Sequence, residues 1–257
     1  MIYWQALKPR RLDNHMAPRL KQLSTLVWLV PLGIAALSFF ALAQQPAEGP
    51  GGGKAKGVKG KEGGPRAPLF LREEWKQTPA GGEHAVTPAE AVSNPNLELK
   101  LYGPDAKNIQ LTGAAADEGN PIHLWNGITE SPIAVTLRDK SNFVDLTGVA
   151  RIKWNTKMSG LHQVHPVVKL ADGTWLLGDR GTGSVVDWHE DDFSLADVRW
   201  LRLDINKIQT KGNFLEKADL TKVDEVGFAD LMAGSGHGPG GWADVGKIEV
   251  YGKPVAR

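Results

Sequence analysis

The chain has 257 residues and a formal net charge of +1, so no overall field attracts nucleic acid. It contains no cysteine, which excludes disulfides, thiolate metal sites and a cysteine nucleophile. Nine tryptophans stand beside only three tyrosines. Tryptophan serves both large β-cores and the stacking of sugar rings, so composition alone leaves the function open.

The N-terminal part has the pattern of an export signal. Residues 23–43 are almost wholly apolar, follow a basic segment with Arg10 and Arg11, and end in Ala41-Leu42-Ala43. This predicts a signal peptide, residues 1–43, cleaved after Ala43. A retained membrane anchor is the alternative, because the apolar run is just long enough to span a bilayer. Met16 offers a second start. In either case we expect the remainder to be exported, periplasmic or extracellular, with no membrane contact except through an uncleaved segment.

A linker and one folded domain follow. Residues 44–68 are rich in glycine and lysine and lack the apolar side chains that a core needs, so they are predicted to be a disordered tether. Residues 69–257 form the predicted domain, long enough for one well-buried core.

Alternating apolar and polar residues dominate this domain. Residues 97–102, 149–156 and 199–205 each place apolar side chains at every second position, which is typical of antiparallel strands with one buried face. Asp172-Gly173 between apolar runs predicts a hairpin. The same phase places Trp200 on an exposed face. The core predicted from the alternation contains Leu99, Trp154, Leu203 and Val250.

The remaining segments fit the same class. Thr87-Pro88-Ala89-Glu90 predicts one helical turn opened by a capping box. About ten short strands with Gly and Pro turns predict an all-β fold, a two-sheet antiparallel β-sandwich of the jelly-roll type, preceded by the N-terminal signal or anchor helix.

Three places in the sequence resemble a known family. Leu124-Trp125-Asn126-Gly127 precedes a strand, Asp145-Leu146-Thr147-Gly148 leads into the next, and Val226-Gly227-Phe228 precedes a Gly-rich loop and the final Gly246–Tyr251 strand. This order resembles the galactose-binding-like jelly rolls, nearest to the module of complex I intermediate-associated protein 30. The resemblance implies a jelly roll that often binds sugars or serves as an accessory module, and it implies no catalytic set. Residues 206–221 have no counterpart in that pattern.

Several motifs contain residue types that can bind metal ions. His162 and His165 lie three apart in a strand-like segment, which places them on opposite faces rather than around one metal ion. An acidic group surrounds His189 and comprises Asp187, Glu190, Asp191 and Asp192. Carboxylate oxygens on a loop suit a structural calcium ion, although the spacing of these residues is not that of an EF-hand. No other cofactor is predicted.

Gly236–Gly241 matches G-x-G-x-x-G, but Pro239 and the following strand favour a loop between strands over a phosphate-binding turn.

Tryptophans near strand ends give the predicted ligand site. Trp125, Trp175 and Trp188 lie close in sequence to planar polar groups, here Arg180 and Asp187. Aromatic faces with polar groups that hydrogen-bond in pairs are what sugar recognition requires. We therefore predict an exported, non-catalytic module that binds carbohydrate through these five residues.

Two alternatives stay open. A structural domain would bind a protein partner through Tyr102, Trp200 and Tyr251 on an outer sheet. A polysaccharide hydrolase or lyase would need a pair of carboxylates, and the sequence marks no such pair.

Overall fold

The computed structural model describes residues 66–77, 83–238 and 240–257. The predicted signal or anchor segment and residues 44–65 of the predicted linker lie outside this part of the chain. Within it, no helix is long and apolar enough to cross a membrane.

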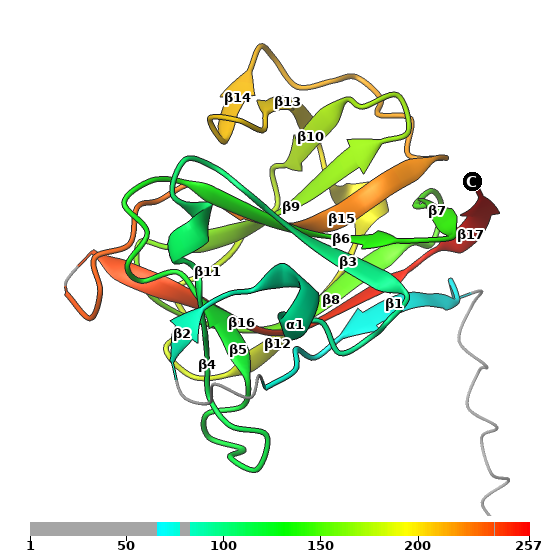
Figure 1. The fold of residues 1–257 in the computed structure, drawn as a ribbon. Helices are drawn as coiled ribbons and strands as arrows, with labels where there is room; N and C mark the ends of the chain where they lie inside the picture. Colours follow the sequence, from blue (N-terminus) through cyan, green and yellow to red (C-terminus); the bar gives the residue numbers. More distant parts are fainter. Residues whose placement is uncertain (1–65, 78–82, 239) are drawn as a thin grey trace, which may run out of the picture. The chain divides into compact units, whose positions relative to one another are not determined.

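The described residues form two antiparallel sheets, which Figure 1 shows one above the other. The lower, seven-stranded sheet has the order β12-β8-β16-β5-β4-β2, and β1 also pairs with β16. Its strands are β1 (Leu69–Glu73), β2 (His84–Ala85), β4 (Gln110–Thr112), β5 (His123–Trp125), β8 (Arg151–Gly160), β12 (His189–Ser194) and β16 (Gly241–Tyr251).

The upper, ten-stranded sheet has the order β14-β13-β10-β9-β15-β6-β3, with β7, β11 and β17 paired beside it. Its strands are β3 (Leu97–Tyr102), β6 (Ile133–Asp139), β7 (Asn142–Asp145), β9 (Gln163–Leu170), β10 (Trp175–Gly178), β11 (Thr182–Gly183), β13 (Trp200–Asp204), β14 (Gln209–Lys211), β15 (Val223–Asp230) and β17 (Lys253–Ala256). The predicted two-sheet β-sandwich is therefore confirmed.

The core between the sheets follows from the alternation. On β8, Ile152 and Trp154 are at most 1% exposed, whereas Arg151 and Lys153, which alternate with them, are only half-buried. Leu99 of β3 and Val250 of β16 belong to the same buried cluster, as predicted.

Two predicted positions are wrong. Trp200, predicted to be exposed, is 4% exposed and belongs to the main core, because the alternation along β13 has the reverse of the predicted phase. Leu203, predicted to lie between the sheets, belongs to a second buried cluster. That cluster lies on the other face of the ten-stranded sheet, and Ile208 from the segment before β14 completes it.

The sequence predicted the hairpin turn correctly, and it predicted the helical turn but not how its N-terminus is capped. The predicted helical turn is α1 (Pro88–Ala91) with Thr87 as its N-cap, but the Thr87 side chain makes no capping hydrogen bond. Gly173 adopts a φ of +87° in the β9–β10 hairpin, the conformation for which a turn selects glycine. Two 3₁₀ turns, η1 (Ala106–Asn108) and η2 (Leu195–Asp197), complete the described elements.

Three of the four acidic residues considered for calcium belong to strand β12, and alternation divides its side chains between two faces; Asp187 precedes the strand. Glu190 forms ion pairs with Lys153 and Lys247, and Asp192 pairs with Arg151. His189 contacts Asp191 instead. The described residues contain no group of three His, Asp or Glu side chains placed to hold a metal ion.

Candidate functional site

One row of side chains crosses the outer face of the seven-stranded sheet. Asp244 of β16 is opposite Lys157 of β8 on one side and Trp125 of β5 on the other. Trp242 and His123 lie two residues away along β16 and β5, so the period of two puts them on the same face. The strand register alone thus gathers aromatic, acidic and basic groups.

These side chains surround a hollow of about 190 Å³, which we call the aromatic hollow. It is lined by Glu83, Thr112, Asn120, His123, Trp125, Lys157, His237, Trp242 and Asp244.

Aromatic rings and a single ammonium group alternate around this hollow. The Nζ atom of Lys157 lies 5.5 Å from the ring centroid of Trp242 and 6.0 Å from that of Trp188. Trp188 contacts the ring of His123 edge-on, with centroids 5.2 Å apart. Among the described residues Lys157 makes no ion pair, whereas the neighbouring Lys153 and Lys247 are both paired with Glu190.

A second aromatic contact, a stacked one, forms part of the wall of the hollow. Trp125 is 7% exposed, and the ring of His237 lies almost parallel to it, with centroids 5.4 Å apart and an interplanar angle of 18°. His237 comes from the Gly-rich connection between β15 and β16, so this loop covers one ring of the site.

A buried acid lies beneath the rings. Asp244 is 4% exposed, and its Oδ1 atom makes no hydrogen bond with any residue that the structure describes, although it lies 3.4 Å from Nε2 of His123. Burial raises the pKa of Asp244 to about 7, against the opposing effect of the Lys157 charge. Burial also lowers the pKa of His123, whose Nδ1 is 2.7 Å from the carbonyl oxygen of Pro121. Near neutral pH the site therefore holds a neutral imidazole and a carboxyl close to its titration point.

The five predicted ligand residues are not all brought together. Trp125 lines the aromatic hollow, and Trp188 contacts the ring of His123, which also lines it. Trp175 begins β10 in the other sheet, where its ring is 4.9 Å from that of Tyr102.

Arg180 lies over the ring of Phe193, and Asp187 is exposed. Neither lines the aromatic hollow. The binding role of the five residues stays a prediction, and the arrangement favours only the first pair as members of one site.

The predicted protein-binding surface is not continuous. Trp200 is buried, and Tyr102 and Tyr251 belong to different sheets.

The sequence analysis missed Trp242, Asp244, His123, Lys157 and His237. The prediction began the last strand at Gly246, whereas β16 begins at Gly241. Trp242 and Asp244 alternate with Ala243 and Val245, and this pattern is the signal that would have placed both polar-face residues on the strand.

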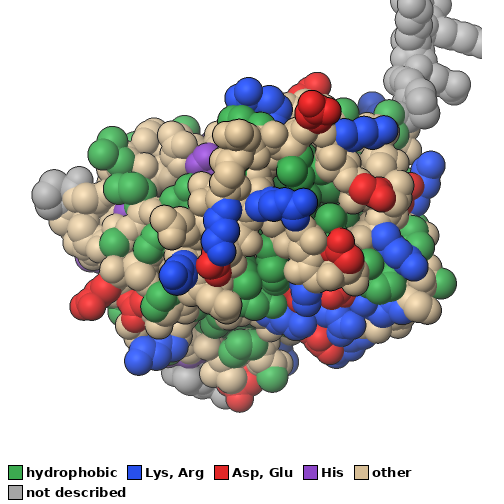
Figure 2. Space-filling view, turned by 90° about the horizontal axis from the view of Figure 1, so that it is seen from above, with side chains coloured by type: hydrophobic (Ala, Val, Ile, Leu, Met, Phe, Trp, Pro, Cys, Tyr) green, Lys and Arg blue, Asp and Glu red, His purple; other side chains and the backbone are tan. Residues whose placement is uncertain are grey.

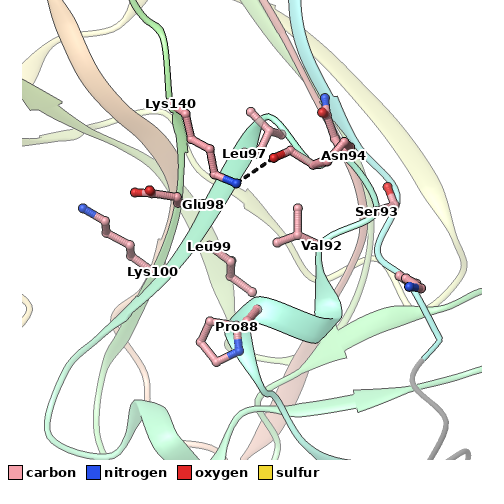
Figure 3. Close-up of a pocket in the computed structure, with 12 residues that line it drawn as sticks. Pro88, Val92, Ser93, Asn94, Leu97, Glu98, Leu99, Lys100 and Lys140 are labelled. Atoms are coloured by element: carbon pink, nitrogen blue, oxygen red, sulfur yellow. Dashed lines mark hydrogen bonds between the residues drawn. The ribbon is translucent and has the colours of Figure 1, made fainter.

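A larger hollow lies elsewhere, between α1 and the edge strand β3, with a volume of about 740 Å³ (Figure 3). No aromatic side chain lines it. The Nζ atom of Lys140 donates to the carbonyl oxygen of Pro95 across it, and Ser93 is held by the buried Glu73. Its polar groups are engaged in holding the chain together, so we do not assign it a ligand.

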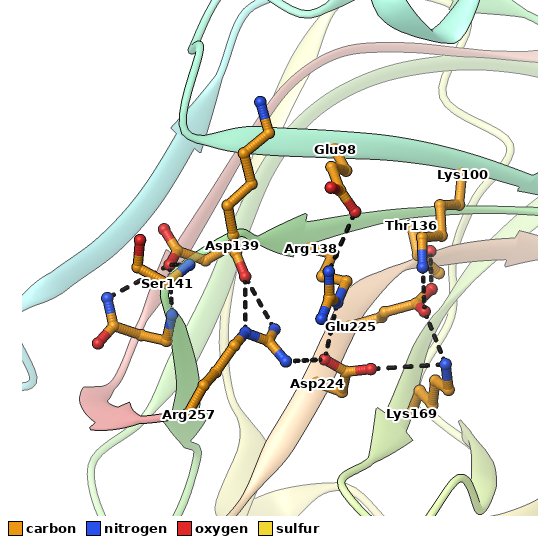
Figure 4. A network of polar contacts seen from close by, with 12 residues as sticks. Glu98, Lys100, Thr136, Arg138, Asp139, Ser141, Lys169, Asp224, Glu225 and Arg257 are labelled. Atoms are coloured by element: carbon orange, nitrogen blue, oxygen red, sulfur yellow. Dashed lines mark hydrogen bonds and ion pairs between the residues drawn. The ribbon is translucent and has the colours of Figure 1, made fainter.

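The outer face of the ten-stranded sheet carries a polar network instead (Figure 4). Glu225 is fully buried and accepts hydrogen bonds from Lys100, Tyr102, Thr136 and Lys169 at 2.7 to 3.1 Å. Burial and then this carboxylate raise the pKa of the Tyr102 hydroxyl. The donors and acceptors are mutually satisfied, which is typical of a structural network.

Charges of both signs are interspersed over the face seen in Figure 2, in keeping with the net charge of +1. We see no single-sign area there that would recruit a polyanion.

Comparisons with known proteins give weak likenesses. No family model and no curated protein matches the chain, so the nearness to complex I intermediate-associated protein 30 is not supported. Among solved structures, the chain is similar to the family 11 carbohydrate-binding module of the cellulase Lic26A-Cel5E of Clostridium thermocellum, with 15% identity, a TM-score of 0.41, and coverage of 67% of this chain and 96% of that one.

It is also similar to TmCBM61 in complex with β-1,4-galactotriose, with 12% identity, a TM-score of 0.33, and coverage of 60% and 88%. The carbohydrate recognition domain of Emp47p gives 10% identity, a TM-score of 0.30, and coverage of 62% and 89%. Similarities this low carry no argument about ligand or family.

Proposed function

We propose that this chain is a non-catalytic carbohydrate-binding module whose ligand occupies the aromatic hollow. The observation that carries the proposal is the placement of Lys157, which makes no ion pair within the described part of the chain, between the rings of Trp188 and Trp242. A sugar presents apolar C–H patches and hydroxyl groups in alternation, and this hollow offers ring faces and hydrogen-bonding groups in alternation.

The polar lining supports the same ligand class. Thr112 and Asn120 supply neutral donors and acceptors, and one oxygen of the buried Asp244 has no hydrogen-bond partner among the described residues. A buried polar atom without a partner costs free energy unless a ligand or water satisfies it. A hydroxyl-rich ligand is suited to this, because each hydroxyl both donates and accepts.

Export is the second part of the proposal. It rests on the basic flank, the apolar run of residues 23–43 and the Ala41-Leu42-Ala43 end. An exported module with a Gly/Lys-rich tether would meet polysaccharide outside the cytoplasm, either as a free protein or from the inner membrane.

Isothermal titration of the domain, residues 66–257, against a panel of soluble glycans tests the binding. We expect at least one glycan to bind, and Trp242→Ala to weaken that binding by about tenfold or more, corresponding to a loss of about 1.4 kcal/mol. Trp175→Ala is the matched control, because it removes an indole from the other sheet and should leave the affinity unchanged.

Circular dichroism of both variants establishes that each is folded. The proposal fails if no glycan gives heat, or if Trp175→Ala weakens binding as much as Trp242→Ala.

A polysaccharide hydrolase is the second candidate, favoured by one observation. A carboxyl with a pKa of about 7, such as Asp244, is suited to general acid catalysis, and Glu83 lines the same hollow. Release of reducing ends from polysaccharide, abolished in Asp244→Asn, would establish this function in place of simple binding.

A further inference from the structure

Trp188 lies beside the aromatic hollow and beside a second hollow on the same sheet. Its ring contacts His123 and Lys157, which line the aromatic hollow. Its ring also lies over Gly246, which lines a neighbouring hollow of about 340 Å³. One indole thus contacts lining residues of both hollows, although it lines neither of them.

A bulge in β16 provides the seat for this ring. The pairing between β16 and β8 shifts between Val245 and Lys247, so Gly246 is the extra residue. A Cβ atom at Gly246 would come within 3.2 Å of Cζ3 of Trp188, closer than ordinary van der Waals contact. Glycine at the bulge therefore allows the indole to lie close to the sheet.

The neighbouring hollow also combines apolar and polar lining. It is lined by Glu74, Trp75, Ala115, Pro121, Ile122, Asn155, Gly246 and Lys247. The indole nitrogen of Trp75 donates to the carbonyl oxygen of Val245, which fixes the ring beside β16. Among the described residues, the side-chain amide of Asn155 makes no hydrogen bond, so it is free to bind a ligand there.

The two hollows follow one another along the strands. Asn155 and Lys157 lie on the same face of β8 and are two residues apart, about 7 Å along the strand. Asn155 lines the neighbouring hollow and Lys157 the aromatic hollow. On β16, Gly246 lines the neighbouring hollow and Asp244 lines the aromatic hollow.

The volumes favour joint use of the two hollows. Protein ligand sites typically occupy about 300–1,000 Å³, and the aromatic hollow alone, at about 190 Å³, falls below that range. With the neighbouring hollow of about 340 Å³ the combined space falls within it.

We propose that the ligand is a linear glycan chain that lies along β8 and β16, fills both hollows and crosses Trp188, rather than a single terminal sugar. This rests on the proposed carbohydrate-binding function. Consecutive sugar units would contact the Trp242 side, then Trp188, then Asn155.

The test compares chain lengths within each glycan series. Titration uses the di-, tetra- and hexasaccharides of β-1,4-linked glucose, xylose and mannose and of β-1,3-linked glucose. We expect the tetrasaccharide of the recognised series to bind at least about tenfold more tightly than its disaccharide, a difference of about 1.4 kcal/mol.

Two variants on the far side of Trp188 locate the added contacts. Asn155→Ala removes a hydrogen-bonding amide, and Ala115→Leu adds volume from an exposed loop position. Each should lower the tetrasaccharide affinity about fivefold and leave the disaccharide affinity unchanged. Trp175→Ala should change neither.

The outcomes separate the two proposals. Equal affinity for the disaccharide and tetrasaccharide would overturn the chain-binding proposal and leave the carbohydrate-binding function in place. A tetrasaccharide gain that survives both variants would also overturn it, because the added contacts would then lie elsewhere. No binding of any series, nor of any other glycan in the panel, would refute both proposals.

Discussion

The Nδ1 atom of His162 lies 2.6 Å from Oδ2 of Asp230, and both side chains are fully buried. The same Oδ2 accepts a hydrogen bond from Nδ2 of Asn126 at 2.6 Å, and Oδ1 of Asn126 accepts from the backbone N–H of Ala243. Asn126 follows Trp125, and Ala243 lies between Trp242 and Asp244. The buried pair therefore fixes the two strands that carry the aromatic hollow.

Removal of this acid should destabilise the domain strongly. Asp230→Ala leaves His162 and Asn126 buried without their shared partner, and we expect a loss of about 3 to 5 kcal/mol in the free energy of unfolding. Urea denaturation followed by tryptophan fluorescence measures the loss.

His165→Ala is the control, because His165 is half-buried on the opposite face and its Nδ1 contacts only the carbonyl oxygen of Gly178. A loss from Asp230→Ala no larger than that from His165→Ala would contradict this account.

The Glu225 network should make stability depend on acid pH. Burial acts to raise the pKa of Glu225, but hydrogen bonds from Thr136, Lys169, Tyr102 and Lys100 outweigh burial and hold it below its ordinary value of 4.5. A carboxyl with a lowered pKa in the folded state stabilises that state above its unfolded pKa, and the stabilisation is lost as the pH falls through the folded pKa.

Glu225→Gln should therefore cost about 2 to 3 kcal/mol at pH 7 and much less near pH 3. Urea denaturation at both pH values checks this. An equal cost at pH 7 and pH 3 would show that the charge of Glu225 has no part in it.

Side-chain alternation predicted the long strands because it reports burial directly. Leu97, Leu99 and Trp154 point inward as their period of two requires. Strand β12 escaped prediction because His189–Ser194 is almost entirely polar and no apolar period marks it. Its strand conformation depends on pairing with β8, whose Arg151 and Lys153 neutralise Asp192 and Glu190 across the ladder.

The candidate site was only partly predictable for a related reason. Trp125 and Trp188 stood out as aromatic residues at strand ends. Trp242 lies directly after a Gly-rich segment that masks the start of the strand, so only the short alternation from Trp242 to Val245 indicates that β16 begins before Gly246. The contact between Trp188 and His123 joins segments more than sixty residues apart, which no local pattern records.

Gly227 should tolerate no side chain. A Cβ atom there would lie 1.9 Å from the carbonyl oxygen of Val135, on the strand β6 that pairs with β15. Gly227→Ala would force the central strands apart, and we expect a loss of about 2 to 3 kcal/mol and a lower Tm in thermal unfolding.

Gly119→Ala is the matched control, because its Cβ would meet only Oδ1 of Asp117 at 3.4 Å. Equal melting temperatures for the two variants would mean that the sheet can relax around Gly227.

The ionisation of the buried Asp244 should lower the free energy of unfolding as the pH rises from 3.8 to about 7. Its pKa is raised to about 7 in the folded protein from an ordinary value of 3.8, so between these values the folded state binds a proton that the unfolded state lacks. Stability from this group therefore falls as the pH rises through that window and is fully lost above pH 7. Asp244→Asn removes the effect, and the variant should gain about 4 kcal/mol over the parent between pH 4 and pH 8.

Urea denaturation of parent and variant across this range measures the gain. The exposed Asp187→Asn is the control and should show a constant difference. An Asp244→Asn difference that stays flat from pH 4 to pH 8 would mean that Asp244 ionises normally, and the case for a buried acid in the aromatic hollow would be lost.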